Sequence, residues 1–319
     1  MIISTIFNLS IIMVIVGYSY IFKSFIKSED STIYNLDLLY GLFILIFLSL
    51  VLNFIQPLKN FFYITILVGF ISFIIAFVRK KIKINFIYYL IIIFAFIFII
   101  YSHGDNEDSP MYHLQIIKWL YNYKISFGLT NLEIRFGDSS LWFNFLSLFK
   151  YKLKYFNSIH TLNIIPFSII TYEIFKLRKT LSYLFLNLSL SFLFFFSFLH
   201  PFRNGIILNH LHNPEVDTVA MIFFFTSFYL MLKFFEEKKR EIFNLLILSS
   251  SICVVIKISY IGVVLLPIII FFLFYRNDLN KFLKIKLNII LILFFTLWIL
   301  KNFLISGCFI FPISSTCFN

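Results

Sequence analysis

The sequence predicts an all-α integral membrane protein with about ten transmembrane helices, and both its composition and the spacing of its apolar residues indicate this fold class. Of its 319 residues, 61% are hydrophobic and 13% are charged, and the mean hydropathy is +0.94. Soluble domains carry about 25% charged and about 45–50% apolar residues. One soluble core cannot bury this much apolar surface, so we exclude secreted toxins, soluble nucleotide-binding enzymes and nucleic-acid-binding modules.

The apolar residues form blocks of roughly 18 to 22, which is the length an α-helix needs to cross about 30 Å of hydrocarbon. Short polar joints separate the blocks. The predicted spans are residues 1–22, 37–55, 60–78, 84–101, 156–175, 180–199, 216–235, 242–257, 259–275 and 286–305. The block 242–275 is too long for a single crossing and long enough for two, with a turn near Lys257.

The net charge of +12 indicates membrane topology, not nucleic-acid binding, because short loops rich in Lys and Arg stay in the cytoplasm. Five alternate joints between the predicted spans are basic. They carry Lys23 and Lys27; Arg79, Lys80, Lys81 and Lys83; Lys176, Arg178 and Lys179; Lys233, Lys238, Lys239 and Arg240; and Arg276, Lys281, Lys284 and Lys286. They share one side only if 242–275 crosses twice. The N-terminus is then outside, and the first span is an uncleaved anchor without signal-peptide features.

This topology divides the chain into a four-helix membrane segment (1–101), a large outer loop (102–155) and a C-terminal membrane segment of about six helices (156–319). A second outer loop covers about 200–215, and the C-terminal tail is also outside. All six histidines lie in these outer segments or at their edges. We therefore expect the functional residues on the outer side.

The large loop opens with an acidic run that includes Asp105 and Asp108, which are catalytic candidates together with His113. Ser109 is a candidate N-cap for an amphipathic helix over 111–123 lying at the membrane surface. Carboxylates are also favourable at a helix N-terminus without any catalytic role. His113 falls on the apolar face of that helix, where it is either a core histidine or part of a site with Asp105.

Basic residues of the outer segments are candidates for binding the phosphates of a lipid-linked substrate. An apolar stretch, 141–149, is too short to span and is predicted to lie in the interface with Trp142 at headgroup depth. The lysines that follow either snorkel or bind phosphate. The candidate phosphate-binding residues are Arg135, Lys150, Lys152, Lys154, Arg203 and Lys257.

The cysteines and the second outer loop suggest two further features. His210 and His212, with Asp217 nearby, are a weak metal-binding candidate. Asp217 fits equally well as the start of a helix. Cys308 and Cys317 lie together in the outer tail, where an oxidising compartment permits a disulfide, and we predict that they pair.

Several of these residues resemble a group of poorly characterised bacterial multi-pass membrane proteins associated with surface polysaccharide synthesis. The matching residues are Gly104-Asp105, Tyr112-His113-Leu114-Gln115, Lys118-Trp119, Gly128 to Leu132, Arg135-Phe136-Gly137 and Ser139-Ser140 in the loop, and Lys301 to Cys308, Pro312 and Thr316-Cys317 in the tail. The resemblance departs at Glu133 and Asp138, where related sequences often carry His and Asn. It implies the bacterial inner membrane, and because members are usually longer, a truncated chain is expected.

The predicted arrangement of spans and loops is also similar, more distantly, to that of the GT-C glycosyltransferases, although here the large loop follows four helices instead of one. That resemblance implies a polyprenyl-phosphate sugar donor, a glycan acceptor on the outer face, and Asp105, with Asp108 next, as base or metal ligand. A divalent metal stays open as a cofactor. The alternatives are a polysaccharide polymerase, which Arg135 and Arg203 would serve, and a flippase, which would need paired ionisable residues at mid-membrane.

Overall fold

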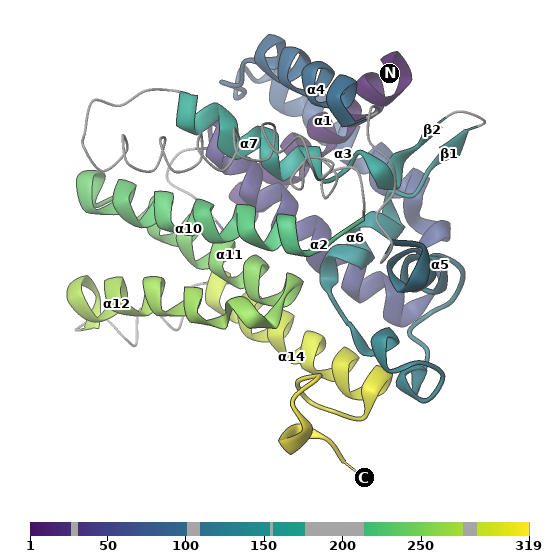
Figure 1. Ribbon diagram of the computed structural model, residues 1–319. Coiled ribbons are helices and arrows are strands. Elements are labelled where there is room, and N and C mark those ends of the chain that lie inside the picture. Colours follow the sequence, from purple (N-terminus) through teal and green to yellow (C-terminus); the bar gives the residue numbers. More distant parts are fainter. Residues whose placement is uncertain (27–30, 101–108, 154–155, 176–213, 277–285, 319) are drawn as a thin grey trace, which may run out of the picture.

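The structure is a computed structural model that describes residues 1–26, 31–100, 109–153, 156–175, 214–276 and 286–318. These residues are mostly helical, and long helices lie side by side in a bundle (Figure 1). The helices are α1 (Ile2–Ile26), α2 (Leu38–Ile55), α3 (Phe62–Val78), α4 (Phe86–Ile100), α5 (Leu114–Asn122), α6 (Leu141–Leu148), α7 (Ile164–Phe175), α10 (Asp217–Glu237), α11 (Arg240–Ile256), α12 (Leu265–Phe274) and α14 (Lys286–Ser306). Two short strands, β1 (Lys152–Leu153) and β2 (Phe156–Asn157), pair antiparallel with Lys152 opposite Asn157.

Within the described residues, five helical segments are long and apolar enough to cross a membrane. They are Ile2–Ile26, Asn35–Ile55, Leu58–Val78, Asp217–Glu237 and Lys286–Ser306, and each overlaps a predicted span. The predicted span 180–199 lies outside the described residues. Span 156–175 is shorter than predicted, since α7 begins only at Ile164. Its first residues carry polar side chains that bond to the loop instead, as where Ser158 Oγ accepts from Tyr151 N at 2.8 Å.

Helix α1 packs closely against α2 and α3 because glycines remove side chains at both crossings. A Cβ atom at Gly17 would overlap the carbonyl oxygen of Gly69, and one at Gly41 would overlap the carbonyl oxygen of Ile15. The backbone N–H of Gly41 also donates to Ser19 Oγ at 3.0 Å. Small residues at helix crossings are typical of bundles in lipid, where tight packing and short hydrogen bonds hold helices together.

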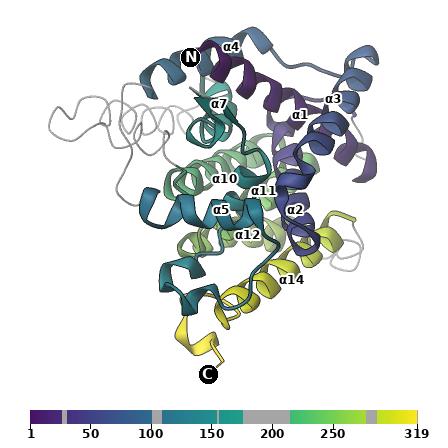
Figure 2. The same ribbon diagram turned by 90° about the vertical axis from the view of Figure 1, so that its right-hand side faces the viewer.

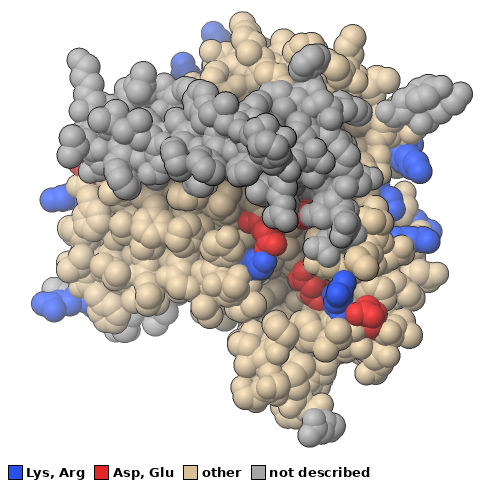
Figure 3. Space-filling view, viewed as in Figure 1, with Lys and Arg blue, Asp and Glu red and all other residues tan. Residues whose placement is uncertain are grey.

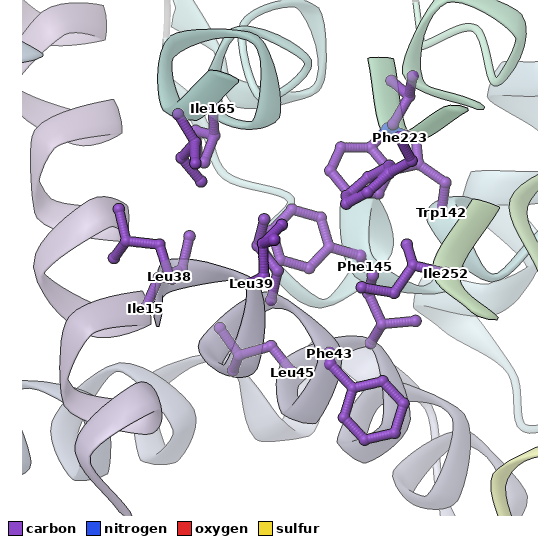
Figure 4. Packing of buried hydrophobic residues seen from close by; sticks show 14 of the residues in the cluster. Ile15, Leu38, Leu39, Phe43, Leu45, Trp142, Phe145, Ile165, Phe223 and Ile252 are labelled. Carbon is purple, nitrogen blue, oxygen red and sulfur yellow. The ribbon is translucent and has the colours of Figure 1, made fainter. Parts of the chain in front are cut away.

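Helix α6 lies in the hydrophobic core of the protein, so 141–149 packs against other helices and offers no face to lipid, while its predicted depth at the membrane interface stays a prediction. All residues of α6 are buried, and Trp142 is 0% exposed. The indole N–H of Trp142 donates to Asn163 Oδ1 at 2.7 Å. Figure 4 shows Trp142 beside Phe223, and Trp142 and Phe145 belong to one cluster of buried side chains that also includes Ile15, Leu38, Leu39, Phe43, Leu45, Ile165, Phe223 and Ile252 from other helices. The segment is apolar because it packs against protein, which hydropathy alone cannot distinguish from packing against lipid.

The bundle has two distinct ends. At the basic end, Lys286 Nζ donates to the carbonyl of Phe25 at 3.0 Å, and Ile33 N donates to the carbonyl of Lys81 at 2.7 Å. At the opposite end, which we call the loop end, lie α5, α6 and the tail 307–318 (Figures 1 and 2). There Gly128 N donates to the carbonyl of Leu304 at 2.9 Å. Segments that the charge pattern predicted to share a side are thus in contact with one another.

Candidate functional site

The loop-end site consists of Asp138, Ser139, Asn144, Lys301 and Asn302, which come from α6, the segment before it and α14. Lys301 Nζ donates to the carbonyl oxygen of Ser139 at 2.9 Å and to Asn144 Oδ1 at 2.7 Å. Ser139 Oγ donates to Asn302 Oδ1. Consecutive residues of α14 therefore hold the segment before α6 in place. Lys301 is 1% exposed, so its charge is enclosed by protein.

The local sequence positions Asp138 by starting α6 two residues later. Ser140 is the N-cap of α6, and its Oγ accepts from Trp142 N at 3.3 Å. Asp138 Oδ1 accepts from Ser140 N at 3.2 Å, which is the local turn that Asp side chains favour. Two successive side-chain acceptors thus satisfy backbone N–H groups and orient the Asp138 carboxyl group relative to α14.

The surroundings of Asp138 change its acidity. Asp138 is partly buried, and burial raises the pKa of its carboxyl group above the usual value. The hydrogen bond from Ser140 and the positive charges of Lys301 and Lys257 lower the pKa and offset part of this effect. A carboxyl group whose pKa moves toward neutral values beside cations is suited to accept and release a proton.

An ion pair between Lys257 and Asp217 borders the loop-end site. Lys257 follows the last residue of α11, and Asp217 is the first residue of α10. Hydrogen bonds through Asn163 connect α6 to the segment just before Asp217. Asn163 Oδ1 accepts from the indole N–H of Trp142, and Asn163 Nδ2 donates to the carbonyl of Glu215 at 3.2 Å. On the face drawn in Figure 3, acidic and basic side chains lie next to one another on a surface that is mostly uncharged.

The predicted catalytic residues fall in two groups. Asp105 and Asp108 lie outside the described residues. His113 is buried between aromatic rings, with ring-centroid distances of 4.1 Å to Tyr112 and 5.3 Å to Phe143. The predicted helix over 111–123 is helical along almost its whole length, because a π-helical turn, Ser109–His113, leads directly into α5 (Leu114–Asn122). Its apolar face packs against α6, so His113 lies in the protein interior.

Those predicted phosphate-binding residues that the structure describes do not form one site. Arg135 is exposed and lies over the ring of Tyr112, with 5.8 Å between guanidinium carbon and ring centroid. Lys150 lies over the ring of Tyr121 at 4.7 Å. Burial, and then the nearby charges of Lys118 and Lys152, lower the pKa of Lys150. These three lysines form a second basic patch, while Lys154 and Arg203 lie outside the described residues.

The metal and disulfide predictions are placed as follows. His210 and His212 lie outside the described residues, and Asp217 is ion-paired with Lys257. Where the chain is described, it contains no group of three or more His, Cys, Asp or Glu side chains placed to hold a metal ion. Cys308 and Cys317 are joined by a disulfide that closes the tail beyond α14.

One protein family matches the chain, over residues 1–319, and its description is a domain of unknown function, DUF8201. The chain belongs to the DUF8201 family. No curated protein and no solved structure matches it.

None of the five residues of this DUF8201 member's loop-end site was among the candidates that the sequence suggested. Lys301 had a signal, because an ionisable residue inside an apolar span is a functional candidate by default. Asp138 was not named as a candidate, because the sequence departs at this position from the group it resembles. Asn144 had no signal, since a buried amide in a short apolar helix cannot be distinguished in sequence from an exposed one.

A second buried polar cluster, at the basic end of this DUF8201 chain, was also missed. The basic-end cluster consists of Lys23, Asn35, Asp37, Glu173, Tyr229 and Lys233. Lys23 Nζ and Asp37 Oδ2 form an ion pair at 3.0 Å, with side chains 1% and 7% exposed. Glu173 accepts from Asn35 Nδ2 at 3.0 Å and from Tyr229 at 3.1 Å, and lies 3.7 Å from Lys233 Nζ. These buried charges lie near helix ends, not at mid-helix.

Proposed function

We propose that this protein is a membrane glycosyltransferase that moves a sugar from a polyprenyl-phosphate donor to a lipid-linked or surface glycan at its loop end. One observation carries the proposal: the Asp138 carboxyl group, which accepts from Ser140 N, lies next in the chain to Ser139, whose carbonyl oxygen binds the buried Lys301 ammonium at the end of apolar helices. Acid–base chemistry next to one buried and one partly exposed cation suits a reaction that releases a phosphate.

The membrane setting is part of the proposal. Helix α3 exposes large apolar side chains such as Ile64, Leu67 and Ile71, which suits contact with lipid tails. The basic end would lie in the cytoplasm and the loop end outside, as the positive-inside rule predicts. We place the protein in a bacterial inner membrane with about ten spans on the same grounds.

The proposed chemistry assigns one role to each charged group. The acceptor hydroxyl attacks the anomeric carbon, and its proton passes to the Asp138 carboxylate. The bond between that carbon and the carrier phosphate oxygen breaks, and its electron pair leaves with the phosphate. Lys301 and Lys257 would stabilise the charge on the leaving phosphate. Asp105 and Asp108 keep the role of base that the GT-C resemblance implies, as rivals to Asp138 in the same loop.

The test is mass spectrometry of the surface glycan from a strain lacking this gene, complemented with wild type, Asp138→Asn or Asp105→Asn. Glu237→Gln, at the basic end, is the matched control, and membrane abundance of each variant is measured in parallel. We expect the deletion to lose a defined sugar, wild type, Asp105→Asn and Glu237→Gln to restore it, and Asp138→Asn to fail. If Asp105→Asn fails and Asp138→Asn restores the sugar, the base is Asp105.

Other glycan patterns would contradict the proposal. Single complete repeat units in the deletion strain would indicate a polymerase. Complete units that accumulate inside the cell would indicate a flippase. An unchanged glycan in the deletion strain would reject all three functions.

A further inference from the structure

Lys301 and Asn144 have more buried N–H donors than there are hydrogen-bond acceptors around them among the described residues. The Lys301 ammonium has three N–H donors, and its bonds to Ser139 and Asn144 use two of them. Among the described residues, no carboxylate lies within ion-pair distance of this ammonium. Taking a lysine out of water is unfavourable unless an opposite charge or several acceptors compensate it.

The contact with Lys301 fixes which way the Asn144 amide points. An ammonium only donates hydrogen bonds, so the Asn144 carbonyl oxygen must face it, and a flipped amide is excluded. The amide nitrogen then faces away from Lys301. This nitrogen is buried and has no hydrogen-bond partner in the part of the chain that the structure describes. Asn144 itself is 0% exposed.

A third buried donor lies on the same face of α14. Trp298 precedes Lys301 by three residues, which places both side chains on one side of the helix about 4.5 Å apart along its axis. The indole nitrogen of Trp298 is buried and lacks a hydrogen-bond partner among the described residues. Buried donors without acceptors are rare in proteins and often mark a binding site or an unseen ligand.

We infer that Lys301, Asn144 and Trp298 form an anchor for the phosphate group of a lipid-linked substrate. A phosphate brings negative charge and several acceptor oxygens, which matches one cation and two neutral donors. Lys301 lies about five residues before the end of α14, or about 7 Å along the axis, a depth suited to a lipid headgroup. The lipid part of this inference rests on the proposed function, whereas anion binding does not.

A purely structural role explains only part of the arrangement. Lys301 and Asn302 hold Ser139 in place, and Asn302 Nδ2 also donates to the carbonyl of Phe309 at 3.3 Å. Such a tether accounts for the bonds that Lys301 makes. It does not account for buried donors on Asn144 and Trp298 that meet no acceptor in the described ranges.

The test separates these roles with Asn144→Asp in the full chain purified in detergent. The aspartate keeps an oxygen toward Lys301, so a structural role predicts an equal or higher unfolding temperature. It also replaces the free donor with a negative oxygen that repels phosphate. Asn131→Asp, which adds the same charge at an exposed loop position, is the matched control. Trp298→Phe removes the indole donor and keeps most of the ring packing.

The measured quantity is the shift in unfolding temperature on adding a polyprenyl phosphate, the matching polyprenol or inorganic phosphate. We expect the polyprenyl phosphate to stabilise wild type and Asn131→Asp, and the polyprenol to have no effect. Asn144→Asp should bind it about tenfold or more weakly, and Trp298→Phe several-fold more weakly.

Four results would overturn the inference. Equal stabilisation of wild type and Asn144→Asp rejects the anchor, and if Asn144→Asp does not fold, unchanged binding by Trp298→Phe rejects it. Equal effects of polyprenol and polyprenyl phosphate reject a phosphate site. Stabilisation by inorganic phosphate at the same concentrations rejects the lipid as its source. Because the assay needs no sugar and no acceptor, a failed glycan test would leave its outcome intact.

Discussion

The two ends of the bundle bury charge in different ways. In the basic-end cluster, Lys23 is paired with Asp37, and Glu173 has both a lysine and two neutral donors. At the loop end, Lys301 is equally buried but meets only neutral oxygens. Paired charges in the interior hold helices in one arrangement, whereas an unmatched cation leaves room for a negatively charged ligand. We infer that the basic-end cluster stabilises the fold and that the loop end binds a negatively charged ligand.

The largest loss of stability is expected when the buried ion pair at the basic end is split. Asp37→Leu leaves the Lys23 ammonium buried without its carboxylate, and loss of one partner of a buried pair costs about 3–5 kcal/mol. We expect a large drop in the unfolding temperature of the protein in detergent. The double variant Lys23→Met with Asp37→Leu removes both charges and should recover most of the loss. A double variant as unstable as the single one would show that the pair is not the source.

A smaller change in stability is expected at the loop end, where it depends on pH through Asp138. Burial raises the pKa of Asp138 in the folded chain above the usual 3.8. The protonated form therefore favours folding, so the contribution is fully present below about pH 3.8 and is lost as the pH rises through the folded-state pKa. Asp138→Asn keeps an oxygen for Ser140 N and cannot titrate. Unfolding temperatures of the two proteins, measured from acid to neutral pH, should show wild type losing stability relative to the variant. A gain in the stability of wild type relative to the variant as the pH rises would contradict this prediction.

The smallest effect is expected at the partly exposed ion pair. Lys257 and Asp217 have side-chain exposures of 37% and 55%, and exposed pairs contribute about 0.2–1 kcal/mol. Lys257→Met should lower the unfolding temperature by roughly 2 °C or less. It also removes one charge that lowers the pKa of Asp138, so the loss of stability with pH should move to higher pH. A large drop in stability would place this pair with the structural cluster of the basic end.

Several features were predictable from the sequence because they depend on neighbours along the chain. Hydropathy over a window predicted the helices that became α1, α2, α3, α10 and α14, within a few residues of their ends. Charge in the short joints predicted which segments lie together at each end. Cys308 and Cys317 were expected to pair because they are the only two cysteines in the tail, and the structure joins them.

Other features depended on contacts between residues far apart in the chain. Lys301 meets Asn144 across 157 positions, and Asn35 meets Glu173 across 138. A sequence pattern records residue types and local spacing, and such pairs have neither a fixed spacing nor a periodicity. The same limit explains why the burial of α6 against other helices was not predicted and why Asp138 was not named as a candidate.

The sequence by itself therefore determined the apolar class of the chain, the position of its long helices and the separation of a basic end from a loop end. These follow from local hydropathy and charge, which act on each segment without regard to the rest of the fold. Only the tertiary structure decided that Lys301 is buried against Asn144 and that Asp138 lies near Lys257. Burial and the directions of hydrogen bonds exist only once distant helices pack, and they determine both the acidity of Asp138 and the unpaired donors of Asn144.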